Sequence, residues 1–169
     1  MKTLILFRHG KSDWDAGESS DHDRPLAKRG RKAAKAMGKF LALAGQVPDA
    51  AVTSSAVRAR SSLEIAMDAG GWNCPVRVAR SLYEAAPLTL LKEVCAEPAG
   101  TQRLLLTGHE PALSEFASLL IGGGELEVPT ACMIRIDLEG ESWAGVAYGS
   151  GSLIWVVPPR LLTDGDLEL

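Results

Sequence analysis

The most constraining feature of this chain is a short apolar run at its N-terminus. Residues 3–7 contain no charged side chain and no polar alternation. Such a run is typical of a strand buried on both faces, as in parallel sheets. It is followed directly by Arg8, His9, Gly10, Lys11 and Ser12. Because open α/β sheets bind ligands at the carboxyl ends of their strands, these groups indicate a site for an anion, above all a phosphoryl group.

Length and charge exclude several classes of protein. The chain has 169 residues, enough for one domain with a core, and its net charge is −3. A general nucleic-acid surface would require a basic excess. No apolar stretch is long enough for a membrane span, and the run before Arg8 is too short for a secretory signal. We therefore expect a cytoplasmic protein that acts on neither nucleic acid nor membrane.

The three cysteines, Cys74, Cys95 and Cys132, are widely spaced and include no C-x-x-C pair. This spacing indicates neither a zinc site nor a disulfide framework. Reduced thiols packed as small apolar side chains are the expected state. The sequence sets no oligomeric state.

Apolar runs alternate with segments of helical period through the first 120 residues. Further strands are expected at about 50–53, 76–79 and 103–107. Helices are expected at about 27–43, at 56–69, from Pro87 through Val94, and from Pro111 to 120. This order predicts a three-layer α/β/α sandwich with a mainly parallel central sheet.

The last third of the chain has a different pattern. Residues 131–138 alternate between apolar and polar, as a half-buried strand does. Two more strands are expected at 142–148 and 153–157, and one of the late strands is expected to run antiparallel. We predict a single domain over residues 1–158 and a C-terminal tail over 159–169, which is acidic from Thr163 onward.

Polar side chains follow three of the expected parallel strands. Arg8 and His9 follow the first, Arg58 begins the helix after the second, and His109 follows the strand at 103–107. Because the carboxyl ends of parallel strands emerge on one side of a sheet, we expect these four side chains in one crevice. Helix N-termini would point into the same crevice and favour an anion.

This ordered set resembles the histidine phosphatase superfamily and is most similar to its short SixA-like phosphohistidine phosphatase branch. The resemblance spans about residues 2–157 and implies the phosphoglycerate mutase-like fold. The matching motifs are Arg8-His9-Gly10, Ser54-Ser55-x-x-Arg58-Ala59, Gly108-His109, Asp23-Arg24-Pro25-Leu26, Arg29-Gly30 and Leu82-Tyr83-Glu84-Ala85. A three-residue motif alone is weak, but the ordered set is specific.

The resemblance implies a role for each of the four residues. His9 is similar to the nucleophile that carries a transient phosphohistidine. Arg8 and Arg58 correspond to the guanidinium groups that hold the phosphoryl oxygens. His109 corresponds to a hydrogen-bond donor to the same oxygens. Positioning and charge neutralisation supply most of the catalysis in phosphoryl transfer.

The identity of a general acid stays open at this point. Glu84 is the first candidate for protonating the leaving group, and Glu110 is the second. A phosphohistidine substrate needs less help, because imidazole has a pKa near neutrality. Lys11 and Ser12 are expected to line the mouth of the site and contact substrate.

The resemblance implies a hydrolase that needs neither metal nor cofactor and acts on a phosphorylated protein or a small phosphate ester. Larger sugar-phosphate members of the superfamily carry a long insertion that this chain lacks between Val78 and Arg103. We therefore expect an open site that admits a protein-borne phosphate. The alternatives are a small-metabolite phosphatase, a metal hydrolase using both histidines, and a phosphate-binding module without turnover.

Overall fold

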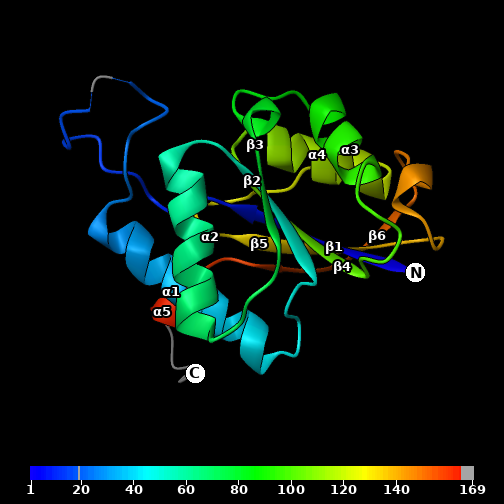
Figure 1. The fold of residues 1–169 in the computed structure, drawn as a ribbon, viewed down its shortest axis with the longest axis horizontal. Helices are drawn as coiled ribbons and strands as arrows, with labels where there is room; N and C mark the ends of the chain where they lie inside the picture. The colour runs from blue at the N-terminus through cyan, green and yellow to red at the C-terminus, as the bar shows by residue number, and fades with distance from the viewer. Residues whose placement is uncertain (19, 165–169) are drawn as a thin grey trace.

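The computed structural model describes residues 1–18 and 20–164 (Figure 1). Its centre is a six-stranded sheet of order β3-β2-β4-β1-β5-β6. The strands are β1 (Lys2–Arg8), β2 (Ala50–Ser54), β3 (Val76–Ala79), β4 (Arg103–Gly108), β5 (Met133–Leu138) and β6 (Gly151–Val157). The helices are α1 (Lys28–Leu43), α2 (Val57–Gly70), α3 (Pro87–Cys95), α4 (Ala112–Ile121) and α5 (Arg160–Thr163).

The strand directions confirm the expected mainly parallel sheet. β1 pairs in parallel with β4, β4 with β2, and β2 with β3. β5 runs antiparallel to both of its neighbours, β1 and β6. Five strands therefore share one direction and β5 alone opposes them, so one late strand is antiparallel, as the sequence predicted.

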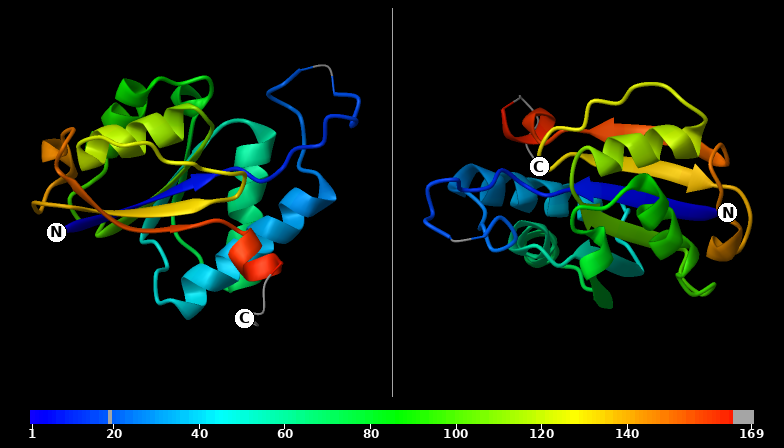
Figure 2. Two further views of the ribbon diagram at one scale, coloured as in Figure 1. Left: turned by 180° about the vertical axis from the view of Figure 1, so that it is seen from behind. Right: turned by 90° about the horizontal axis from the view of Figure 1, so that it is seen from above.

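Helices cover both faces of the sheet, with α1 and α2 on one side and α3 and α4 on the other (Figure 2). The side chains of β1 alternate between these layers. Leu4 and Leu6 belong to the core under α3 and α4, whereas Ile5 and Phe7 belong to the core under α1 and α2. All four are almost fully buried. The unbroken apolar run is thus explained, because a strand covered on both faces has no polar side.

The expected strand at residues 142–148 is wrong. This segment contains a short 3₁₀ turn at Trp143–Gly145. The side chain of Trp143 is fully buried, and its indole Nε1 donates to the carbonyl oxygen of Thr101 at 2.8 Å. The Ser142 hydroxyl accepts from the amide of Ala144 and stabilises the turn. The apolar residues of this segment anchor a turn to the core. An anchored turn has a composition similar to that of a strand, and for this reason a strand was predicted.

Part of the expected C-terminal tail, residues 159–169, is helical and packs against the domain. Residues 160–163 form α5, which contacts α1, and Leu162 packs against the core beneath α1 and α2. Residues 165–169 lie outside the described residues. The short helix α5 therefore packs with the rest of the domain. The domain boundary near residue 158 stays a prediction.

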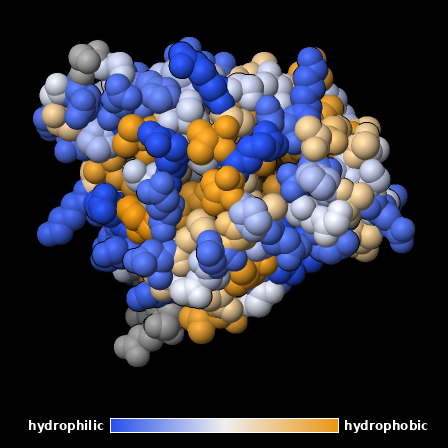
Figure 3. All heavy atoms as spheres, viewed as in Figure 1, coloured by the Kyte–Doolittle hydropathy of each residue, from blue (hydrophilic) through white to orange (hydrophobic). Residues whose placement is uncertain are grey.

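The surface carries no long apolar helix. None of the helices in the described residues has the length and apolar composition needed to cross a bilayer. The edge strand β3 exposes Val76 and Val78. On the face shown in Figure 3, hydrophobic side chains form patches that are separated by hydrophilic ones.

Candidate active site

The carboxyl ends of β1, β2 and β4 bring the predicted residues together. Arg8 is paired with Gly108 across β1 and β4, and the amide of His9 donates to the carbonyl oxygen of Gly108 at 3.2 Å. The rings of His9 and His109 lie 5.1 Å apart, centroid to centroid. Arg58 approaches His9 from the first turn of α2. Side chains from three segments that are distant in sequence therefore meet at the carboxyl ends of these strands.

The imidazole of His9 is buried, with 8% of its surface exposed. Its Nδ1 lies 2.7 Å from the carbonyl oxygen of Gly10. A carbonyl oxygen only accepts, so Nδ1 carries the proton and Nε2 keeps its lone pair. Burial lowers the pKa of His9 to about 4; Arg58 and Arg8 add to this effect, while the bond to Gly10 opposes it. His9 is therefore neutral near pH 7, with Nε2 available as a nucleophile.

His109 is held through one ring nitrogen. Its Nε2 lies 2.7 Å from the hydroxyl oxygen of Ser54. The same oxygen accepts a hydrogen bond from the amide of Ala56. Its Nδ1 is buried without a hydrogen-bond partner among the described residues. Burial, together with the nearby His9 and Arg58, lowers the pKa of His109 to about 3. Ser54 thus orients a catalytic candidate and does not directly cap α2, whose N-cap is Ala56.

Two guanidinium groups flank His9. The Nε of Arg58 lies 3.4 Å from Nε2 of His9, and its terminal nitrogens bind the carbonyl and carboxylate oxygens of Asp21 at 2.7 and 3.0 Å. Arg8 donates to the carbonyl oxygen of Val128 at 2.8 Å. Its Nε is buried and lacks a partner in the described chain. Burial lowers the pKa of Arg8, although the charge of Glu110 opposes this shift.

The structure adds a third cation, Arg24, to which the sequence analysis gave no role. Arg24 is buried, and its guanidinium carbon lies 3.5 Å from the centre of the Trp14 ring. It donates to the Ser12 hydroxyl and, at 2.5 Å, to the carboxylate of Asp21. Its charge also contributes to lowering the pKa of His9. Arg24 therefore belongs to the electrostatic surroundings of the nucleophile.

Asp21 connects three side chains around the crevice, those of Arg24, Arg58 and Tyr83. Its carboxylate accepts from Arg24, from Arg58 and, at 2.7 Å, from the Tyr83 hydroxyl. Although burial alone would raise the pKa of Asp21, these hydrogen bonds and the charge of Arg58 hold it well below its usual value. Burial and the bond to Asp21 raise the pKa of Tyr83. A charged carboxylate thus fixes two arginines beside His9.

The remaining predicted site residues differ in their surroundings. Glu84 is exposed and follows Tyr83 with a left-handed backbone (φ 54°). In the part of the chain that the structure describes, its carboxylate makes no hydrogen bond or ion pair. Glu110 accepts from the amide of Ser114 at 2.8 Å, at the start of α4. Ser12 is buried against Arg24, and Lys11 is half-buried.

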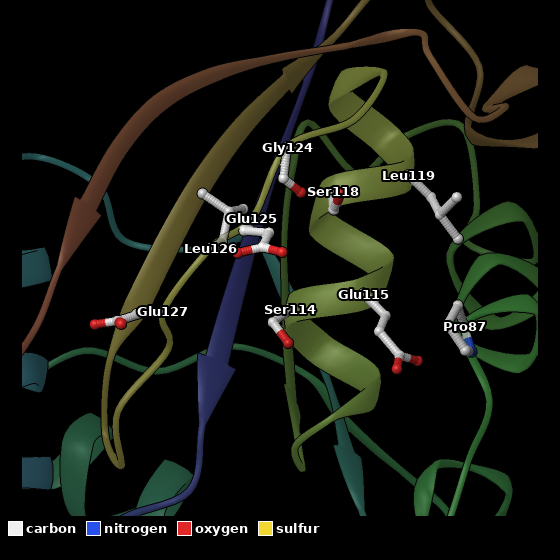
Figure 4. Close-up of a pocket in the computed structure, with 9 residues that line it drawn as sticks. All are labelled: Pro87, Ser114, Glu115, Ser118, Leu119, Gly124, Glu125, Leu126 and Glu127. Carbon is white, nitrogen blue, oxygen red and sulfur yellow. Dashed lines mark hydrogen bonds between the residues drawn. The ribbon is translucent and has the colours of Figure 1, made fainter.

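A separate hollow of about 520 Å³ lies along α4 (Figure 4). It carries the carboxylates of Glu115, Glu125 and Glu127 and contains none of the predicted site residues. Three carboxylates would repel a phosphoryl dianion, so this hollow is unsuited to the predicted chemistry. Over residues 1–18 and 20–164, no group of three His, Cys, Asp or Glu side chains is arranged to hold a metal ion.

Comparison with known proteins agrees with this geometry. A family model described as histidine phosphatase superfamily (branch 1) matches residues 4–87. An uncharacterised protein of Mycobacterium tuberculosis is 36% identical over 164 residues, which cover 91% of this chain and 100% of that protein.

Solved structures agree over nearly the whole chain. One, named "putative phosphohistidine phosphatase SixA" from Nakamurella multipartitia, is 29% identical, covers 94% of this chain and 96% of its own, and has a TM-score of 0.78. The protein histidine phosphatase SixA complexed with tungstate shares the fold, with a TM-score of 0.82 at 21% identity over 95% of this chain and 99% of its own. Together with the arginines and histidines at the sheet edge, these matches show that the chain belongs to the histidine phosphatase superfamily, in its SixA-like branch.

Proposed function

We propose that this protein is a metal-independent phosphatase that transfers a phosphoryl group to His9 and then to water, with protein-borne phosphohistidine as its substrate. The observation that carries the proposal is the state of His9. Its imidazole is neutral, its Nε2 is unprotonated, and the lone pair of that nitrogen accepts a long hydrogen bond from the Arg58 guanidinium at 3.4 Å. A nucleophile beside a fixed cation is the arrangement that phosphoryl transfer requires.

In the first step, the lone pair on Nε2 of His9 forms a bond to phosphorus. The bond from phosphorus to the leaving nitrogen or oxygen breaks, and the leaving atom keeps that electron pair. The charge on the phosphoryl oxygens is neutralised by Arg8, Arg58 and Arg24. A phosphoryl dianion also raises the pKa of the adjacent His109, which can then donate a proton to an equatorial oxygen.

In the second step, water attacks phosphorus from the side opposite His9. The N–P bond breaks, its electron pair returns to Nε2, and inorganic phosphate leaves. The bond from Nδ1 to the Gly10 carbonyl keeps the ring in one tautomer and orientation through both steps. The same arginines hold the phosphoryl group throughout, so little rearrangement is needed between the two steps.

The leaving group decides whether a general acid is needed. Glu84 is the proposed acid for ester substrates, since it is exposed and adjacent to Tyr83, whose ring lies 5.7 Å from that of His109. Phosphohistidine releases imidazole, which accepts a proton near neutral pH without a dedicated acid. The weakly anchored Glu84 therefore fits a substrate with a good leaving group better than an alkyl ester.

The shape of the chain around the site supports a macromolecular substrate. Between β3 and β4 the chain forms only a 3₁₀ turn and α3, so no added segment covers the crevice. The two SixA structures named above share this fold, and one of them is named a protein histidine phosphatase. An open rim lets a histidine on the surface of another protein reach His9.

The test is a substrate panel on wild type and His9→Ala. We expect wild type to hydrolyse an aryl phosphate in excess EDTA, and His9→Ala to lose at least about 10³-fold in kcat. A phosphohistidine protein should give a higher kcat/KM than phosphoserine peptides or sugar phosphates. If a small metabolite is turned over rapidly and every phosphoprotein slowly, the protein is a small-metabolite phosphatase and the phosphohistidine substrate is wrong.

A further inference from the structure

A basic hollow of about 310 Å³ is lined by residues of α1 and α5 and by Lys11 of the loop after β1. Helices α1 and α5 lie side by side (Figures 1 and 2). Four cationic side chains line it: Lys11, Arg29, Lys32 and Arg160. The walls also include the hydroxyl residues Thr130 and Thr163 and a single carboxylate, that of Asp164. We call these seven residues the basic pocket.

Within the described residues, no ion pair neutralises the cations of the basic pocket. Across the described chain, none of the four forms an ion pair or a side-chain hydrogen bond, whereas Arg24, Arg58, Arg77 and Arg135 each pair with a carboxylate. Four cations facing one small volume repel each other, and an anion bound between them would remove that repulsion. The pocket therefore favours an anionic ligand.

The basic pocket is fixed rigidly to the catalytic loop. Lys11 lies two residues after His9, so their Cα atoms are at most about 7 Å apart. A side-chain carbon placed on Gly30 would lie 2.2 Å from the carbonyl oxygen of Lys11, so the backbone of α1 is in direct contact with that loop. On the opposite wall, Thr130 precedes Ala131, whose amide donates to the carbonyl oxygen of His9 at 2.9 Å. Both walls are thus tied to the nucleophile.

We propose that the basic pocket binds a second anionic group on the substrate whose phosphoryl group is transferred to His9. The chemistry that the pocket recognises is a carboxylate or phosphate oxygen near the scissile bond. Two sources can supply it: acidic side chains flanking the phosphohistidine of a protein, or a second acidic group on a small ester. This inference rests on the phosphatase function proposed above and specifies the substrates that it prefers.

The test neutralises the outer cations of the pocket in the triple variant R29Q/K32Q/R160Q, which keeps Lys11. The matched control is R31Q/K35Q/K39Q, which removes three exposed cations of α1 that do not line the pocket. The two variants change the net charge equally, so general attraction of anions changes equally in both. Any difference between them reports on the pocket.

Each variant is assayed with two substrate pairs. The first pair is a phosphohistidine peptide flanked by aspartates and the same peptide flanked by asparagines. The second pair is an aryl phosphate with a ring carboxylate and the same compound without it. We expect the pocket variant to lose about tenfold in kcat/KM on the acidic substrate of each pair, because a few exposed ion pairs together contribute about that much. It should lose less than about twofold on the neutral substrate of each pair. The control variant should lose less than about twofold on all four.

The pattern across the pairs identifies the source of the anion. Discrimination in the peptide pair alone assigns the pocket to acidic side chains of a phosphoprotein, and discrimination in the ester pair alone assigns it to a small metabolite. Equal losses on acidic and neutral members would overturn the inference. If wild type hydrolyses no substrate, the phosphatase proposal fails. Titration calorimetry with the same peptides then tests the pocket alone. Wild type should bind the acidic peptide more tightly than the neutral one, and the pocket variant should bind both equally.

Discussion

The Nε atom of Arg58 lies 3.4 Å from Nε2 of His9. This Nε2 is the unprotonated ring nitrogen, because Nδ1 donates its proton to the Gly10 carbonyl oxygen. The remaining guanidinium nitrogens of Arg58 are held by Asp21. A phosphoryl group bonded to Nε2 would therefore lie against a guanidinium already in position, so stabilising the transition state needs little reorganisation.

Replacing Arg58 tests this relationship. We expect Arg58→Ala to lower kcat for an aryl phosphate by about 10²- to 10³-fold, because one fixed donor to the phosphoryl oxygens is removed. Arg31→Ala, which removes an exposed cation of α1, should change kcat less than twofold. Steady-state kinetics on both variants provide the measurement. An Arg58 variant with wild-type kcat would place the phosphoryl group elsewhere.

Removing the carboxylate of Asp21 should make phosphate a stronger inhibitor. Asp21 neutralises part of the charge of Arg24 and Arg58 in the free site, so Asp21→Asn leaves more positive charge for an anion. We expect the inhibition constant for inorganic phosphate to fall severalfold while kcat falls, because the arginines lose their orientation. Asp23→Asn, at an exposed residue that contacts His22, is the control. Weaker phosphate inhibition in Asp21→Asn would contradict this account.

The two histidines should stay neutral far below the ordinary imidazole pKa. Burial lowers the pKa of His9 to about 4 and that of His109 to about 3, so both gain a proton only in strong acid. A ¹H–¹³C NMR titration, assigned with His9→Gln and His109→Gln, should show no change in either ring between pH 8 and 5.5. Titration of either ring near pH 6.5 in the free protein would refute the neutral-nucleophile account.

The same pKa shifts predict a loss of stability in mild acid. Below pH 6.5 the unfolded chain protonates both histidines and the folded protein does not, so the free energy of unfolding falls as pH decreases from about 6.5 toward 4. The loss between pH 7 and 5 should be on the order of 3 kcal/mol. Urea unfolding at the two pH values measures it, and His109→Gln should show about half the wild-type loss. Equal losses in both proteins would exclude His109 as a source.

The close contact at Gly30 predicts a steric effect on the site. A Cβ there would meet the Lys11 backbone at 2.2 Å, so Gly30→Ala must displace α1 or the catalytic loop. We expect a destabilisation of about 1–3 kcal/mol, as for other overpacked sites, together with reduced kcat/KM. Gly100→Ala, where nothing lies within 4 Å of an added Cβ, should stay within about 0.5 kcal/mol of wild type. Thermal unfolding and aryl phosphate assays distinguish the two.

Sequence reasoning predicted well the parts of the fold that depend on buried periodicity. The run at Leu4 and Leu6 is apolar because helices cover both faces of β1, and this signal is local. It failed at Trp143, since a buried anchor in a turn produces the same apolar composition as a strand. The predicted convergence of His9 and His109 followed from strand direction, which the parallel pairing of β1 and β4 confirms.

The parts of the site that sequence reasoning missed depend on loop folding. Arg24 lies in the loop after Ser12, and nothing in its local sequence tells whether its guanidinium faces solvent or the crevice. Its contacts with Trp14 and Asp21 form only when that loop has folded, because all three residues belong to it. The sequence offered two signals for Arg24. One is the Asp23-Arg24-Pro25-Leu26 motif, which implies no direction for the side chain. The other is an oppositely charged pair three residues apart, which is common on solvated surfaces.

The most direct test of the central proposal is rapid-quench mass spectrometry of the protein during turnover of an aryl phosphate in EDTA. The account predicts a phosphoryl group on His9, formed and lost at the rate of turnover and absent from His9→Ala. Turnover that persists in His9→Ala, with no phosphorylated histidine in wild type, would contradict it.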